Sequence, residues 1–268
     1  MDVSKIKEAL HKYFLDILTS EATSDSRQAK LAWRMKCFEA GLDYAQYIED
    51  NFFPLRQKKV LDVACAWGGH AVAFASVGAS VTGTDLNYHC YSELFNFSKA
   101  NWLDIALYLA DCRYLPFSDE NFDVILALCL IEHIDSVETF AREIARLLKR
   151  GGLCIMMTPS RWTSIFWGEP HYQLKGLSIL PFPLQGFVAT RFFKRSYPFP
   201  ITRQYSFASN VVKVFSDVGL KCQPVLRDGR LMRIGKRFPL LAPLVKEMFW
   251  SFFVIQKEKD TKSSSMIA

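Results

Sequence analysis

The first candidate binding site is a run of small residues that follows an apolar stretch. Residues 60–70 read V-L-D-V-A-C-A-W-G-G-H, with Asp62 in the apolar part and small side chains after it. Small side chains let a ligand approach the backbone and the N-terminus of the next helix. A nucleotide-binding turn usually has glycine where this chain has Ala64 and Ala66. Taken alone, the pattern fits tight packing of a strand against a helix equally well.

Acidic residues also end the next two apolar stretches. Asp85 closes residues 81–85, and Asp111 follows residues 105–110. At the end of the second strand of a nucleotide-binding sheet, a carboxylate can bind both hydroxyls of a ribose. A nicotinamide cofactor would need the same acid, so Asp85 predicts a ribose without choosing the cofactor. For Asp111, the cap of a helix or turn is the alternative interpretation.

Two further clusters could carry acid–base chemistry. Glu132 and His133 follow a fourth apolar stretch, and an imidazole can take up a proton near neutral pH. A histidine that only fixes this loop is an equally good interpretation. His171 and Tyr172 lie in the motif G-E-P-H-Y, inside an aromatic-rich segment. That segment, residues 160–206, could close over a substrate, form the core of a small subdomain or make a dimer contact.

The elements that must position these residues alternate between strands and helices. The strands show no polar alternation, as expected for strands covered on both faces, and their order with the helices predicts a doubly wound parallel α/β sheet. We expect strands at residues 60–63, 81–85, 105–110, 122–130 and 153–157, with helices at 69–77 and 88–101 and one from Asp135 to a stop at Gly151 and Gly152. Later elements are expected at residues 208–219 (helix), 222–226 (strand) and 251–257 (strand).

Five motifs in order resemble those of the class I S-adenosylmethionine-dependent methyltransferases of the broad small-molecule type. The first is V-L-D-V-A-C-A-W-G-G, and the second is the acidic G-T-D-L. A-D-C-R-Y-L-P-F is similar to the adenine-contacting segment and F-D-V-I-L-A-L-C-L-I-E-H-I to the fourth strand. L-L-K-R-G-G-L-C-I is similar to the turn before the fifth strand. The resemblance covers about residues 55–160 and departs from the family at Ala64 and Ala66.

This resemblance implies a mostly parallel, seven-stranded Rossmann-like sheet with an antiparallel last strand and a lid insertion. It implies S-adenosyl-L-methionine as the cofactor, with the methionine part along the first turn, the ribose on Asp85 and the adenine near Asp111. The expected cofactor-binding residues are Asp62, Ala64, Cys65, Ala66, Gly68, Asp85, Leu86, Asp111, Cys112 and Leu128, and the candidate catalytic residues are His133, Glu132, His171 and Tyr172. We expect no bound metal.

The expected organisation follows the same resemblance. The parts are an N-terminal helical cap at 1–50, a cofactor-binding core at 51–160, an acceptor-binding lid at 161–206, a C-terminal helix and antiparallel hairpin at 207–257, and a flexible tail at 258–268. Two other function classes stay open, because the first turn and Asp85 fit them as well. They are a nicotinamide-dependent oxidoreductase and a non-catalytic cofactor-binding module. The resemblance favours a methyltransferase that acts on an oxygen or nitrogen of a small-molecule, glycan or lipid-linked acceptor.

Charge is distributed unevenly along the chain. The net charge is +6, yet residues 160–257 hold 15 Lys and Arg against 4 Asp and Glu. A basic half would attract an anionic acceptor or an anionic membrane surface, while a solvated basic face is the plain alternative. No regular basic face or nucleic-acid module is evident, so we expect no nucleic-acid partner. The seven cysteines form no C-x-x-C pair, which predicts a cytoplasmic protein with reduced thiols and leaves peripheral membrane contact open.

Overall fold

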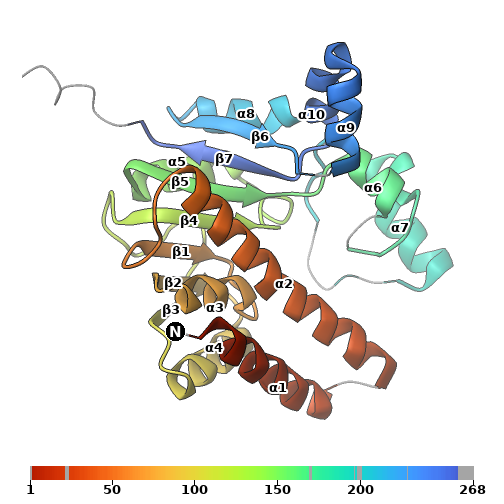
Figure 1. The fold of residues 1–268 in the computed structure, drawn as a ribbon. Coiled ribbons are helices and arrows are strands. Elements are labelled where there is room, and N and C mark those ends of the chain that lie inside the picture. The colour runs from red at the N-terminus through yellow and green to blue at the C-terminus, as the bar shows by residue number, and fades with distance from the viewer. Residues whose placement is uncertain are drawn as a thin grey trace, which may run out of the picture. The chain divides into compact units, whose positions relative to one another are not determined.

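The computed structural model describes residues 2–21, 24–168, 171–195, 197, 201–227 and 229–258 (Figure 1). Within helices, the side chains of residues 20, 21, 24–26, 230 and 235 also lie outside this description. The chain divides into two compact units. The first comprises residues 1–126 with 147–149, and the second comprises residues 127–146 with 150–268. Each unit carries one of the candidate binding regions that the sequence predicts.

The strands form a seven-stranded sheet in the order β3-β2-β1-β4-β5-β7-β6. This order confirms the expected Rossmann-like sheet with its antiparallel last strand. The strands are β1 (Lys59–Val63), β2 (Ser80–Asp85), β3 (Ile105–Leu109), β4 (Phe122–Leu128), β5 (Leu148–Met157), β6 (Lys221–Val225) and β7 (Phe252–Gln256).

The strand registers explain why acidic residues gather at one edge of the first unit. β1 pairs in parallel with β2, and β2 pairs in parallel with β3, so the ends of all three lie together. In the second unit, β7 runs antiparallel to both β5 and β6, with Ile155 opposite Val254 and Cys222 opposite Ile255. The hairpin expected between the last two strands is therefore confirmed.

The connection between α5 (Val137–Leu147) and β5 differs from the expected one. Ser136, not Asp135, caps the helix, since its hydroxyl accepts a hydrogen bond of 3.3 Å from the amide of Thr139. The helix ends at Leu147, and the chain continues at once into β5. Gly151 and Gly152 lie inside that strand, where Gly151 has φ of +78°. The expected glycine stop was wrong because the pattern did not show that the strand begins with Leu148.

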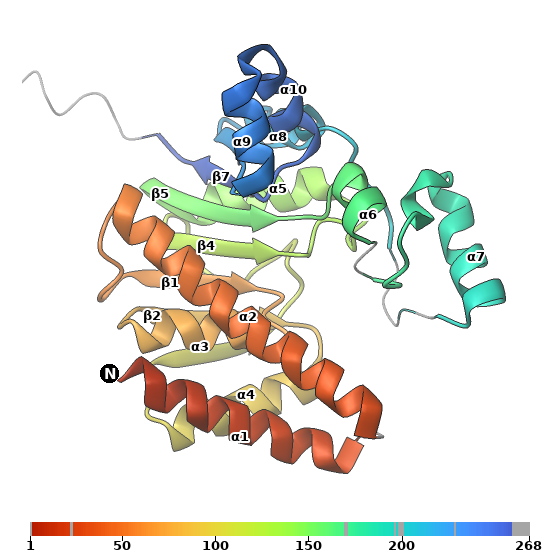
Figure 2. The ribbon, with the colours of Figure 1, turned by 45° about the vertical axis from the view of Figure 1, so that its right-hand side comes forward.

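The first unit is completed by four helices. They are α1 (Val3–Glu21), α2 (Ser24–Asn51), α3 (Gly69–Ser76) and α4 (Tyr88–Ala100). α1 and α2 lie side by side in both views, and α2 packs along α3 (Figures 1 and 2). Glycines make the contact between α2 and α3 close. A Cβ atom on Gly41 would lie 2.6 Å from the Ala73 Cβ, and one on Gly69 would lie 2.8 Å from the Cys37 Cβ.

The second unit contains α5 and the helices after β5. These are α6 (Arg161–Trp167), α7 (Phe182–Phe193), α8 (Ala208–Ser216), α9 (Gly229–Arg237) and α10 (Ala242–Met248), with short 3-10 turns η1 (Leu177–Ile179) and η2 (Pro239–Leu241). α9 packs against α10, and α10 also contacts α8 and β6 (Figure 2). In the described part of the chain, no helix combines the length and apolar character needed to cross a membrane.

The close approach of α2 and α3 yields a prediction about stability. Replacing Gly41→Ala would push a methyl group against Ala73 and the backbone of His70, so the two helices must separate. Overpacking of this kind costs about 1–3 kcal/mol of unfolding free energy, measured by urea denaturation. Gly229→Ala is the matched control, because its new Cβ would meet nothing within 4 Å. Equal stability of both variants would show that the α2–α3 contact is loose.

Candidate functional site

The turn after β1 keeps a glycine-like backbone without the usual glycines. Ala64 has φ of 56° and Ala66 has φ of 46°, both in the left-handed region that glycine favours. Gly68 follows with φ of 74°, and a Cβ there would lie 2.4 Å from the Leu94 side chain. An alanine in this conformation costs roughly 1–2 kcal/mol. The backbone shape is therefore retained at a cost in stability, as often occurs at binding sites.

Asp85 holds this turn directly. One of its carboxylate oxygens accepts a hydrogen bond of 2.8 Å from the amide of Ala66, and the other accepts one of 2.8 Å from the amide of Asn87. The next residue, Leu86, is 74% exposed. A partly exposed carboxylate beside an exposed apolar side chain suits a ligand with hydroxyls and a flat ring, such as an adenosine.

Asp62 and Cys65 lie beneath the turn. Asp62 is 2% exposed, and burial together with the negative charge of Asp85 raises its pKa to about 8. The Asp62 carboxyl is thus protonated at neutral pH, and the backbone amide of Ala71 donates a hydrogen bond to it. Burial also raises the pKa of the Cys65 thiol well above its usual value. These contacts support anchoring of the turn by Asp62, and its direct contact with a cofactor stays a prediction.

Asp111 pairs with its neighbour after β3. Its carboxylate accepts hydrogen bonds from the Arg113 amide at 2.9 Å and from the Arg113 guanidinium at 2.6 Å. These bonds to Arg113 lower the pKa of Asp111, which is therefore ionised at neutral pH. Cys112 is 9% exposed, with its thiol pKa raised to about 12 mainly by burial. The adenine contact expected of Asp111 and Cys112 stays a prediction.

Arg34 is a residue that the sequence analysis missed. This α2 residue is 4% exposed, and its guanidinium carbon lies 3.4 Å from the centre of the Trp67 ring in the first turn. The sequence pattern of α2 gave no sign of this contact, because Arg34 lies 26 residues before Val60, where the first motif begins. A buried guanidinium at the turn could bind the carboxylate of a ligand.

The loop after β4 positions the second candidate site, which lies entirely in the second unit. Leu128 is partly buried, and Cys129 has φ of 53°, so the chain turns sharply where the strand ends. Glu132 follows and is 2% exposed. Thr202 holds this loop, since its amide and hydroxyl donate to the Glu132 carbonyl at 2.8 and 3.1 Å, and Arg203 donates to the Asp135 carbonyl.

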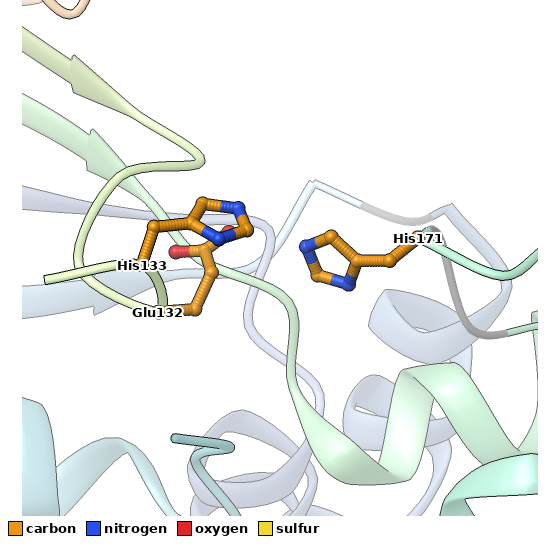
Figure 3. A group of neighbouring side chains, drawn as sticks. All are labelled: Glu132, His133 and His171. Atoms are coloured by element: carbon orange, nitrogen blue, oxygen red, sulfur yellow. The ribbon is translucent and has the colours of Figure 1, made fainter. Parts of the chain in front are cut away.

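The structure brings His171 to this loop (Figure 3). The rings of His133 and His171 lie 5.1 Å apart at 86°, and each contacts the Tyr197 ring, at 5.7 and 4.8 Å. One ligand atom each from Glu132, His133 and His171 lies within 4.8 Å of the other two. The sequence analysis placed Glu132 and His133 in one cluster and His171 in another. Only the folded structure shows that the three side chains lie together. Glu169 and Pro170 of the G-E-P-H-Y motif lie outside the described residues.

A cavity of about 180 Å³ opens beside this cluster. Tyr172 also lines it, and a Cβ on Gly186 would lie 3.1 Å from the Tyr172 hydroxyl, so the glycine makes room for it. Gln185 ties the walls together, because its amide donates to Gln204, which in turn donates to the Ser178 hydroxyl. The lining residues are Glu132, Pro159, His171, Tyr172, Phe182, Pro183, Gln185, Gly186, Ile201, Arg203 and Gln204.

Known proteins resemble this chain over the part that contains the first turn and the strands after it. The family described as "Methyltransferase domain" matches residues 61–156. A "Ubiquinone biosynthesis O-methyltransferase" from Coxiella burnetii is 32% identical over 116 residues, which are 43% of this chain and 49% of that protein. The chain thus spans about half the length of the curated relatives that it matches.

Two solved structures share the fold at low identity. A SAM-dependent methyltransferase from Methanosarcina mazei has a TM-score of 0.55 and 16% identity, covering 80% of this chain and 98% of that one. The [4+2]-cyclase SpnF has a TM-score of 0.52 and 14% identity, covering 81% of each chain. Because the same fold also occurs in a cyclase, the reaction must be argued from the site residues.

The sheet order and the turn after β1 define a Rossmann-like fold. Residues 61–156 of the chain are similar to a methyltransferase domain, and the cofactor that this similarity implies is S-adenosylmethionine.

The two alanines of the first turn give a second prediction. Ala64→Gly and Ala66→Gly should each leave the unfolding free energy unchanged or raise it by about 1 kcal/mol, because relief of the left-handed alanine outweighs the added chain entropy. Binding of S-adenosylhomocysteine should stay equal or tighten. Urea denaturation measures the unfolding free energy, and calorimetric titration measures the binding of S-adenosylhomocysteine. Ala71→Gly in α3 is the control, and it should lower stability by about 1 kcal/mol. Equal losses of unfolding free energy in all three variants would show that Ala64 and Ala66 are not strained.

Proposed function

We propose that this protein transfers the methyl group of S-adenosylmethionine to a hydroxyl oxygen of a small, ring-containing acceptor bound beside Glu132, His133 and His171. The observation that carries the proposal is the pocket in the second unit, where a carboxylate and an imidazole line a cavity of one-ring size. Its volume, about 180 Å³, slightly exceeds the ~150 Å³ that accepts one benzene molecule.

The first unit supplies residues that fit the cofactor. The left-handed turn at Ala64 and Ala66 exposes backbone to the methionine part, Asp85 accepts from the ribose hydroxyls, and Leu86 covers the adenine. We assign the methionine carboxylate to the guanidinium of Arg34. When bound, S-adenosylmethionine supplies an electrophilic methyl group on a sulfonium. The protein must then orient the acceptor oxygen in line and exclude water.

An oxygen acceptor is favoured over a nitrogen acceptor by the cluster in the pocket. A hydroxyl must lose its proton to become a good nucleophile, whereas a neutral amine already has a free electron pair. The Glu132, His133 and His171 cluster can take up that proton, and the Tyr172 hydroxyl can orient the acceptor. The matched relatives named as O-methyltransferases support the same choice.

Binding of the cofactor product tests the first half of the proposal. Asp85→Ala removes a charged acceptor for two ribose hydroxyls, so binding of S-adenosylhomocysteine should weaken by about 1.5–3 kcal/mol in a calorimetric titration. The exposed Asp104→Ala is the control and should bind like the wild type. Unchanged affinity in folded Asp85→Ala would remove Asp85 from the cofactor site.

The reaction itself is tested with the same preparations. Radiolabelled S-adenosylmethionine is incubated with hydroxylated aromatic compounds and with matched compounds that carry an amine instead. Label should enter the hydroxylated set and be lost with Asp85→Ala. A thermal shift caused by NAD and not by S-adenosylhomocysteine would favour an oxidoreductase. Cofactor binding with no transfer to any acceptor would favour a non-catalytic module.

We further propose that the acceptor is anionic or linked to a lipid at an anionic membrane surface. Arg203 lines the pocket, so a negatively charged acceptor would find a cation there. The segment from α9 to α10 exposes basic side chains at Arg233, Lys236 and Arg237 together with apolar ones, while Leu231 and Val245 face inward. The exposed apolar residues are Met232, Ile234, Phe238, Leu240, Leu241 and Leu244. This mixture is typical of an amphipathic surface that lies on a membrane.

Vesicle co-sedimentation measures that contact. Binding to phosphatidylglycerol vesicles should exceed binding to phosphatidylcholine vesicles and weaken with salt, because each basic residue contributes about 1 kcal/mol near an anionic surface. Changing Arg233, Lys236 and Arg237 to Ser should abolish most of the preference. Changing the exposed Lys5, Lys12 and Lys30 to Ser removes the same charge from the first unit. This control should change the preference for phosphatidylglycerol vesicles little. Equal binding to both vesicle types would restrict the proposal to a water-soluble acceptor.

A further inference from the structure

The Glu132, His133 and His171 cluster has the chemistry of a metal site. Two imidazoles and one carboxylate suit divalent transition metals such as zinc and iron(II), whereas calcium and magnesium favour oxygen ligands alone. One ligand atom from each of the three residues lies within 4.8 Å of the others. In a tetrahedral zinc site, two ligand atoms lie about 3.3 Å apart, so each pair of ligand atoms must approach by at most about 1.5 Å to close the set.

The surroundings of the cluster fit such an ion. Glu132 is 2% exposed, so its carboxylate is shielded from bulk water and would attract a cation more strongly than an exposed carboxylate does. Tyr197 packs against both histidine rings and restricts their rotation, while Thr202 fixes the backbone of the loop that carries Glu132. Such support keeps metal ligands in place. Because the cavity opens beside Glu132 and His171, an ion there would keep a coordination position for a ligand.

We propose that Glu132, His133 and His171 bind one divalent transition-metal ion of the zinc type, and that this ion holds and activates the acceptor hydroxyl. The role of the ion rests on the proposed function, whereas its binding does not. Beside a divalent cation, the O–H bond of the acceptor breaks more readily and the proton passes to water. The oxygen keeps the electron pair and uses it to form the O–CH3 bond as the S–CH3 bond of S-adenosylmethionine breaks, which leaves S-adenosylhomocysteine with the sulfur electron pair. The two histidines then act as ligands instead of as the general base.

Metal binding can be measured without turnover. The purified full chain is stripped with a chelator, reloaded with Zn²⁺, passed through a desalting column and analysed for metal. The wild type should retain about one zinc per chain. His171→Ala should lower Zn²⁺ affinity about tenfold or more, because it removes one of three protein ligands. His11→Ala removes an exposed histidine of α1 and should bind like the wild type.

A spectrum shows where the ion binds. Co²⁺ placed in the site should give visible absorption bands of a low-coordinate nitrogen and oxygen environment, and these should be lost in His171→Ala and in Glu132→Gln. Circular dichroism checks that each variant is folded. Since Glu132 is buried, His171→Ala, on the partly exposed segment, keeps the test decisive if Glu132→Gln fails to fold. Retention of less than about a tenth of an equivalent, or equal binding by His171→Ala, would overturn the metal site.

The same samples separate this inference from the proposed function. S-adenosylhomocysteine binding without Zn²⁺ binding would leave the methyltransferase proposal intact and reduce the cluster to a hydrogen-bonded group of side chains. Zn²⁺ binding without S-adenosylhomocysteine binding would support the metal site and overturn the proposed reaction. Where both bind, addition of a hydroxylated acceptor should shift the Co²⁺ bands, and an amine analogue should shift them less.

Discussion

The hydrogen bond from the Ala66 amide to the Asp85 carboxylate is the contact on which the proposed cofactor site depends. It joins the turn after β1 to the end of β2, and it can form only because parallel pairing brings these two ends together. The same bond holds Ala66 in a conformation that an alanine avoids. The turn therefore keeps the shape that a glycine would adopt freely, and the cost is met by bonds that the folded sheet supplies.

The buried residues beneath the turn add a second constraint. Burial, and after it the nearby Asp85, raises the pKa of Asp62 to about 8, so Asp62 fills a structural position at neutral pH without a second negative charge. Its raised pKa means that the native state binds a proton which the unfolded chain releases. This contribution to stability is complete below about pH 4 and is lost as the pH rises through about 8.

The sequence predicted the parts of the fold that depend on local pattern and on strand order. Apolar stretches gave β1 to β4 within a few residues, and the motif order gave the antiparallel position of β7. The pattern failed at the α5–β5 junction, because a glycine pair can stop a helix or lie within a strand. It also missed Arg34, whose contact with Trp67 depends on how α2 crosses the turn. No spacing rule covers such a crossing.

The pocket in the second unit shows most clearly what only a folded chain can reveal. His133 and His171 are separated by more than thirty residues, and neither has a partner at metal-ligand spacing in the sequence. Thr202 and Arg203 donate hydrogen bonds to the carbonyls of Glu132, Ile134 and Asp135, and these bonds fasten residues 202 and 203 to the loop that carries Glu132 and His133. Loss of these bonds would free the loop from residues 202 and 203 even if Glu132, His133 and His171 all remained. The shape of the cavity thus depends on hydrogen bonds to the backbone as much as on the side chains that line it.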